Sequence, residues 1–231
     1  MPTGFSRSPK LLKGAFVKLS DEFLVPIPNI IVFQYNPEKM TRSLSPSAET
    51  SHGDSSNKSS TTEPFDPNES FDLTLELDAA DALEEPDTHP VAVISGVADR
   101  ISAMEMLLYP TGESMLGNAL SSVFGSSDVV PRGSVPVVLF VWGPGRILPV
   151  RLTKFSVEEQ AFSPILYPIR ASVSVSLDVL TDQSFTKLGR KLSASEEIAI
   201  VAYKFTRGQR EVLALANIAN SVESILGMLP F

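Results

Sequence analysis

The stretch VVLFVWGPGRILPVRLTKFSVEEQAFSPILYPIRASVSVSLDVL, residues 137–180, holds three consecutive patterns that are typical of β-strands. The first, Val137–Trp142, is rich in β-branched and aromatic residues, and Gly143–Gly145 ends it. Because the extended pattern resumes at once over Arg146–Phe155, we interpret the two runs as a β-hairpin. The third run predicts a half-buried strand, because its side chains alternate with a period of two. Its apolar members are Ile169, Ala171, Val173, Val175, Leu177 and Val179, opposite Arg170, Ser172, Ser174, Ser176 and Asp178.

The reactive groups of the chain argue against catalysis. There is no cysteine, which excludes a disulfide framework, a cysteine-zinc cluster and a thiol nucleophile. His52 and His89 stand alone in Ser-rich and Pro-rich stretches, where a histidine is usually solvated. Residues Gly112–Gly117 resemble a G-x-S-x-G nucleophile elbow only loosely, because the second glycine comes one residue late. The sequence therefore predicts no enzyme, no catalytic or metal-binding residue and no cofactor.

The acidic charge of the chain is concentrated in one region. The formal net charge is -8, and Glu49–Asp87 holds twelve acidic residues and one basic residue. The segment Ser45–Glu63, which overlaps the start of this region, has almost no apolar side chains that could offset an ordering cost of about 1–2 kcal/mol per residue. We predict a flexible, acidic and Ser-rich loop insertion over residues 45–70. It is either an inserted surface loop that tolerates sequence change or a segment that becomes ordered only against a neighbouring subunit.

Four basic residues of the β-rich stretch are candidates for contacts with an anionic partner: Arg146, Arg151, Lys154 and Arg170. Scattered cations of this kind more often form a solvated face. No aromatic stripe is interleaved with them, so the sequence predicts no nucleic-acid partner.

Further strands and one helix are predicted on the N-terminal side of this stretch. In Phe71–Asp78 the carboxylates share one face without a histidine or nucleophile beside them, which indicates solvated surface instead of an acid-base pair. Apolar residues spaced three and four apart predict a single amphipathic helix that Pro110 ends; they are Ile94, Val97, Ile101, Met104 and Leu108. The other predicted strands are Leu11–Leu19, Ile27–Tyr35 and Met40–Leu44.

The last forty residues change to a helical pattern. Ser193–Glu196 offers a capping box for a helix over Glu196–Thr206, and Gly208 is expected to interrupt it. A second helix then presents a broad apolar stripe, which packs on its own domain or docks onto another subunit. The residues of this tail docking face are Leu215, Ile218, Val222, Ile225 and Leu226.

The chain divides into a β-rich domain over residues 1–190 and a C-terminal helical extension over residues 191–231. The N-terminus lacks an apolar run long enough for a signal peptide, and no segment has the length of a transmembrane helix. We therefore expect a cytoplasmic protein that does not insert into a membrane.

Several segments together resemble the tube-protein domain of contractile injection systems, and most of all the inner-baseplate adaptor that joins spike to tube. The resemblance covers roughly residues 10–182, and its most specific parts are Gln34–Glu38, the MLLYP end of the helix and Ile147–Phe162. The segments are LLKGAFVKL (11–19), IPNIIVFQYNPEKMTRSL (27–44), FDLTLELDAADALEEP (71–86), AMEMLLYP (103–110) and LFVWGPGRILPVRLTKFSVEEQAFSPILYPIRASVSVSLDVL (139–180).

This resemblance implies a mainly β, antiparallel two-sheet or β-barrel tube-like domain with one packed helix. The C-terminal helical tail, predicted from the residue pattern, is a departure from the family. It further implies a self-assembling homo-hexameric ring that contacts the spike hub, the inner tube or tube initiator and other baseplate proteins of a phage-tail-like particle. Many relatives end in a LysM module with a Gly-Asp-Thr-Leu core, which this chain lacks. A role that belongs to that module is therefore not carried over.

Three functions follow as expectations. The first is a structural baseplate ring that templates tube assembly in a particle assembled in the cytoplasm and able to leave the cell. Its mechanism would be pairing or packing of strands Arg146–Phe155 and Ile169–Leu180 between subunits, with Arg146, Arg151, Lys154 and Arg170 at subunit borders or in the lumen. The second is the inner tube or tube-initiator protein, which would differ in copy number. The third, from another class, is a monomeric β-barrel binding module for a small ligand or single-stranded nucleic acid.

Overall fold

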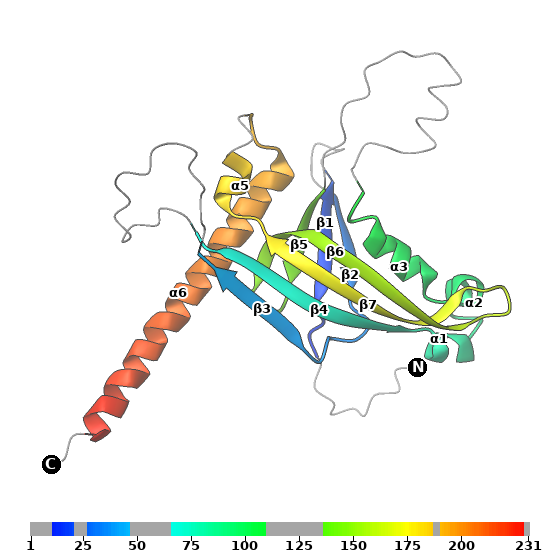
Figure 1. The fold of residues 1–231 in the computed structure, drawn as a ribbon, viewed down its shortest axis with the longest axis horizontal. Helices are drawn as coiled ribbons and strands as arrows, with labels where there is room; N and C mark the ends of the chain where they lie inside the picture. The colour runs from blue at the N-terminus through cyan, green and yellow to red at the C-terminus, as the bar shows by residue number, and fades with distance from the viewer. Residues whose placement is uncertain (1–10, 21–26, 47–65, 110–135, 187–189, 229–231) are drawn as a thin grey trace.

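The fold is built on one antiparallel sheet of seven strands in the order β2-β1-β5-β6-β7-β4-β3, with a long C-terminal helix packed on it (Figure 1). The computed structural model describes residues 11–20, 27–46, 66–109, 136–186 and 190–228. The strands are β1 (Ala15–Ser20), β2 (Ile27–Val32), β3 (Met40–Ser45), β4 (Asn68–Asp78), β5 (Val137–Val141), β6 (Ile147–Phe162) and β7 (Pro168–Val179). The helices are α1 (Ala80–Glu84), α2 (Pro90–Ser95), α3 (Ala98–Glu105), α5 (Asp182–Thr186) and α6 (Ala194–Met228).

The three strand patterns of residues 137–180 form the centre of this sheet. β5 pairs with β6 across the Gly143–Gly145 turn, which confirms the predicted hairpin. β6 continues as a second hairpin with β7, which pairs on its other side with β4. The alternating residues of β7 divide as predicted: Ala171, Val173, Val175, Leu177 and Val179 are buried. The prediction of a mainly β fold is thus confirmed. The alternation with a period of two correctly identified which side chains of β7 enter the core.

The sheet is open, which corrects the expectation of two sheets or a closed barrel: its outer strands, β2 and β3, do not pair with each other. Instead it curls around a shared aromatic core. The ring centroid of Phe140 lies 5.9 Å from that of Phe16 on β1 and 5.6 Å from that of Phe71 on β4. Core packing therefore brings the two halves of the sheet together without hydrogen bonds between its outer strands.

The segment between β2 and β3, residues 33–39, is held by side chains. Gln34 donates from Nε2 to the Asp78 carbonyl at 2.6 Å and accepts from the Asp78 amide at 3.1 Å. Asn36 donates to the Leu12 carbonyl at 2.8 Å and accepts from the Gly14 amide at 2.9 Å. These bonds tie the segment to the residues just before β1 and to the end of β4, so the QYNPE element has a structural role.

The helical region after β4 is broken where one helix was predicted. Gly96 has a φ of 58°, and the Val97 amide donates to the Pro168 carbonyl at 2.9 Å instead of continuing α2. Ile101 and Met104 of α3 are buried as predicted, but Ile94 is 65% exposed. After the break Leu107 is buried in the core in place of the predicted Leu108: Leu107 is 2% exposed and Leu108 is 37% exposed.

Helix α6 runs as one helix from Ala194 to Met228, so the interruption predicted at Gly208 does not occur. The predicted capping box is confirmed: the Glu196 amide donates to Ser193 Oγ at 3.3 Å, and the Ser193 amide donates to Glu196 Oε2 at 2.8 Å. Burial alone would raise the pKa of Glu196, but hydrogen bonds from Arg190 and Ser193 outweigh it and lower the pKa. Across the described ranges, no helix combines the length and apolarity needed to cross a membrane.

We expect Gly96→Ala to destabilise the protein by about 1–3 kcal/mol. A Cβ atom at this position would lie 2.1 Å from the Pro168 carbonyl oxygen, and the positive φ adds strain. Gly145→Ala is the matched control, because a Cβ there meets no atom within 4 Å. Urea unfolding followed by circular dichroism measures both, and equal midpoints for the two variants would contradict the prediction.

Candidate functional site

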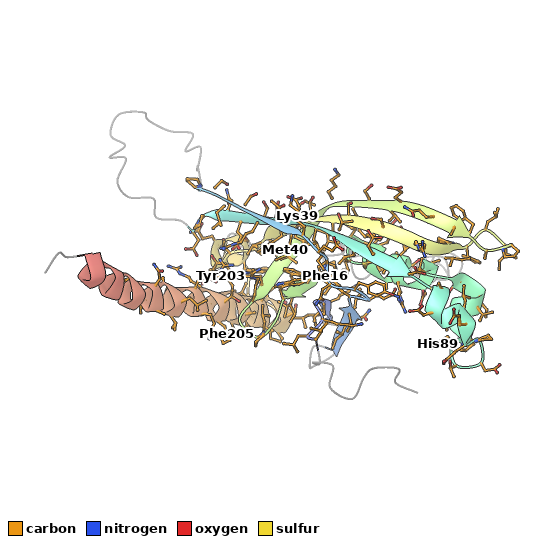
Figure 2. The ribbon with its side chains drawn as sticks, turned by 90° about the horizontal axis from the view of Figure 1, so that it is seen from below. Phe16, Lys39, Met40, His89, Tyr203 and Phe205 are labelled. Atoms are coloured by element: carbon orange, nitrogen blue, oxygen red, sulfur yellow. The ribbon has the colours of Figure 1, made fainter. Side chains whose placement is uncertain are left out.

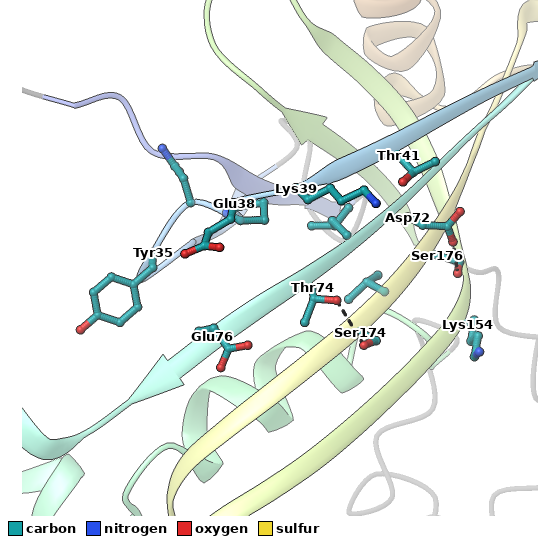
Figure 3. A pocket seen from close by; sticks show the side chains of 14 residues that line it. Tyr35, Glu38, Lys39, Thr41, Asp72, Thr74, Glu76, Lys154, Ser174 and Ser176 are labelled. Atoms are coloured by element: carbon teal, nitrogen blue, oxygen red, sulfur yellow. Dashed lines mark hydrogen bonds between the residues drawn. The ribbon is translucent and has the colours of Figure 1, made fainter.

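The outward faces of β4 and β7 form a polar surface, which we call the polar face. Figure 3 shows Thr74 and Ser174 facing each other across the two strands, with their hydroxyl oxygens 3.4 Å apart. On either side, Ser172 donates to Glu76 at 2.9 Å and Ser176 to Asp72 at 2.6 Å. Of the carboxylates predicted on this face, Asp72 and Glu76 are thus exposed and bonded to hydroxyls of the next strand, whereas Asp78 is partly buried.

A solvent-open groove of about 790 Å³ runs along the polar face. Besides the β4 and β7 side chains, Tyr35, Glu38, Lys39 and Lys154 line it (Figure 3). Both signs of charge and several hydroxyls suit hydrogen bonding to a hydrophilic partner. Lys154 brings one of the predicted cations to this groove.

The groove residues offer hydrogen-bond donors and acceptors and charges of both signs. No histidine lines the groove to activate its hydroxyls. Within the described ranges, no group of three or more histidine, aspartate or glutamate side chains could hold a metal ion. His89 is exposed at the start of α2, and His52 and Ser114 lie outside the described residues.

The structure separates Arg146 from the other three predicted cations. The Arg146 guanidinium is partly buried inside the chain, 5.9 Å from the ring centre of Phe71. Burial, together with the neighbouring charges of Arg42 and Arg210, lowers the pKa of Arg146. Arg146 therefore packs against the core of its own chain, and its assignment to a subunit border or lumen stays a prediction.

The remaining cations, Arg151, Lys154 and Arg170, are exposed on β6 and β7. Arg170 Nη2 lies 2.8 Å from Asp78 Oδ2, which makes a cross-strand ion pair. Arg151 is the register partner of Asp178 on β7. These residues lie where a neighbouring subunit could reach them.

A cluster of charged side chains joins α6 to the start of β4, and the sequence analysis missed it. Glu69 is almost fully buried, and both of its oxygens accept from Arg210 at 2.7 Å. Arg42 on β3 donates to the same carboxylate at 2.6 Å. We call Arg42, Glu69 and Arg210 the carboxylate clamp. Its members are far apart in the chain, so no local pattern could have predicted it.

A second carboxylate, Asp66, extends this junction along α6. It accepts from the Tyr203 hydroxyl at 3.0 Å and from Arg207 at 2.8 Å. Burial foremost, and then the hydrogen bond to Asp66, raises the pKa of Tyr203 to about 12. Tyr203 therefore stays neutral and donates at every physiological pH.

The strand edges differ from the prediction in one respect. β7 is paired along both sides, with β4 and with β6, so it has no free edge for pairing between subunits. β6 is different, because β5 pairs with it only as far as Val150. In the described part of the chain, the side of β6 away from β7 is therefore unpaired from Arg151 to Phe162.

The predicted tail docking face lies in the C-terminal half of α6. Leu215 and Ile218 are 65% and 57% exposed. Val222, Ile225 and Leu226 belong to the same helix, but their side chains lie outside the described set.

No family model matches the chain, and no curated protein matches it. The likeness to tube proteins therefore rests on the sequence segments quoted above.

We expect Glu69→Gln to destabilise the fold by about 2–3 kcal/mol, because it removes the anion between two arginines whose side chains are about one-third exposed. Glu76→Gln is the control, since Glu76 is exposed and bonds only to Ser172 among the described contacts; its effect should stay within about 0.5 kcal/mol. Thermal and urea unfolding at neutral pH measure both. Equal losses in the two variants would contradict a structural role for the carboxylate clamp.

Proposed function

We propose that this chain is a structural baseplate component of a contractile injection system. In this proposal six copies form a ring that joins the spike hub to the inner tube and templates tube assembly. The resemblance of roughly residues 10–182 to the tube-protein domain supports it. The mechanism is recognition between subunits and involves no chemical step.

The observation that carries the proposal is the open edge of β6. Twelve residues, Arg151–Phe162, expose unused backbone donors and acceptors on one side within the described part of the chain. A long open edge favours pairing with another chain. A strand added there by each neighbour would give a head-to-tail contact, which closes into a ring when the rotation between neighbours is a simple fraction of a full turn. β7 takes no part in this pairing, because both of its sides are used.

The polar face supports a second element of the proposal, a hydrated channel wall. Its serine and threonine hydroxyls are already bonded to one another or to carboxylates, so the surface is polar without exposing long apolar side chains. In a ring, Arg151, Lys154 and Arg170 would lie at the channel or at the subunit borders. An inner tube or tube-initiator protein would use the same surfaces, and copy number per particle separates that alternative.

The groove on the polar face favours the other class of function, a monomeric binding module. Its volume of about 790 Å³ lies within the range of small-molecule sites. Against this alternative, the sheet is open and encloses no barrel interior. The groove is also lined largely by polar side chains, whereas most ligand sites are lined by apolar ones.

We expect a tagged chain purified from its native cells to bring down sheathed, tail-like particles. Electron microscopy identifies the particles, and quantitative mass spectrometry counts this chain against the spike and tube proteins. About six copies per particle would support the adaptor, and many copies would move the assignment to the tube. A lone monomer without particles would contradict both and favour the binding module.

Proline substitutions test the open edge directly. Successive residues of a strand point their amides to opposite sides, so prolines placed singly at positions 155–158 divide into two pairs. We expect the pair whose amides face β7 to unfold more easily. The pair facing the open edge should keep the fold but fail to enter particles. Alanine at the same four positions is the control. A folded open-edge proline variant that still assembles would contradict edge pairing.

A further inference from the structure

Helix α6 presents one face to its own sheet. Thr206 Oγ1 donates to the Ile147 carbonyl at 2.7 Å and accepts from the Ile147 amide at 3.0 Å. Four residues later along the same face, Arg210 binds Glu69. Ala199 and Tyr203 on this face are buried in the core. The spacing of 199, 203, 206 and 210 defines this docked face of the helix.

The opposite face of α6 carries a second apolar stripe, and the described large side chains of this stripe face solvent. Its positions alternate in spacing between three and four without a break, from Ile198 to position 226. Figure 2 shows Phe205 of this stripe on the side of the helix away from Tyr203. We call the stripe the heptad seam; it comprises Ile198, Val201, Phe205, Gly208, Val212, Leu215, Ala219, Val222 and Leu226.

The described large side chains of the heptad seam are exposed along both halves of the helix. Val201, Val212 and Leu215 are 67%, 61% and 65% exposed, and Ile198 and Phe205 are 41% and 45% exposed. An isolated surface helix would be expected to turn a polar face to water. A 3-4 spacing sustained over four heptads is instead the pattern of a helix that packs against another helix.

The positions flanking the heptad seam favour an identical helix as the partner. On one flank lie Ala202, Gln209, Ala216 and Glu223, so only one of four positions is charged. On the other flank Lys204 already pairs with Asp182 at 2.9 Å, and Glu211 pairs with Arg207 at 3.3 Å. Charges at these positions set the choice and orientation of the partner helix, and like charges that face each other oppose self-pairing. At these flanks few charges of the same sign would face each other when two copies of the heptad seam meet.

We propose that α6 pairs through the heptad seam with α6 of a second copy of this chain. The docked face lies on the other side of the helix, so each copy keeps its contacts with its own sheet while the seams meet. The contact is distinct from the open edge of β6. It would hold whether or not the chain belongs to a contractile particle.

Leu215→Lys in the full chain tests this pairing against Leu213→Lys. Both leucines lie on the same helix and are about equally exposed, at 65% and 68%, but only Leu215 belongs to the heptad seam. We expect Leu215→Lys to weaken self-association at least about tenfold, because a buried lysine at a seam position is unfavourable. Leu213→Lys should match the unaltered chain. Sedimentation velocity over a concentration series measures the dissociation constants.

Circular dichroism shows whether each variant keeps its helix content. If Leu215→Lys loses helix content, Val201→Lys is compared with Leu213→Lys instead. Val201 lies in the half of α6 that contacts the sheet, belongs to the heptad seam and is 67% exposed. The pairing is disproved if the unaltered chain stays monomeric at hundreds of micromolar, which would leave the helix of a different protein as the occupant. It is also disproved if the seam variants and Leu213→Lys weaken association equally.

Discussion

The carboxylate of Glu69 is the interaction on which the arrangement of sheet and helix depends. It is nearly buried, and it joins Arg42 of β3 and Arg210 of α6 to the start of β4. A buried anion is stable only with such partners, so the three elements hold one another in place. Thr206 fixes the same helix to β6 through the backbone of Ile147. Together they set the direction of α6, and so decide which helix face remains exposed.

Local patterns predicted the strands well because burial alternates along them. The alternation in β7 placed Val173 and Leu177 in the core, but alternation says nothing about whether a sheet closes. The break at Gly96 depends on a hydrogen bond to Pro168, which lies far along the chain. Gly208, by contrast, costs a helix only about 1 kcal/mol, which the packing of the preceding turns can offset.

The candidate site was predictable only in part. Arg151, Lys154 and Arg170 are exposed as surface cations usually are, whereas Arg146 has the same local sequence character and lies beside Phe71. Only the tertiary fold separates them. The tail docking face was recognised from its apolar spacing, but the longer heptad seam was not, because the docked face is interleaved with it along the same helix.

The length of helix α6 also lets a small rotation at one end produce a large displacement at the other. Its described hydrogen bonds to the sheet reach as far as Arg210, and the residues from Glu211 to Met228 continue the helix for about 27 Å. A rotation of about 10° at the fixed half would move the far end by about 5 Å, given that length. Small changes around Glu69 and Thr206 would therefore be amplified into a displacement comparable to one helical turn, at a point remote from the sheet.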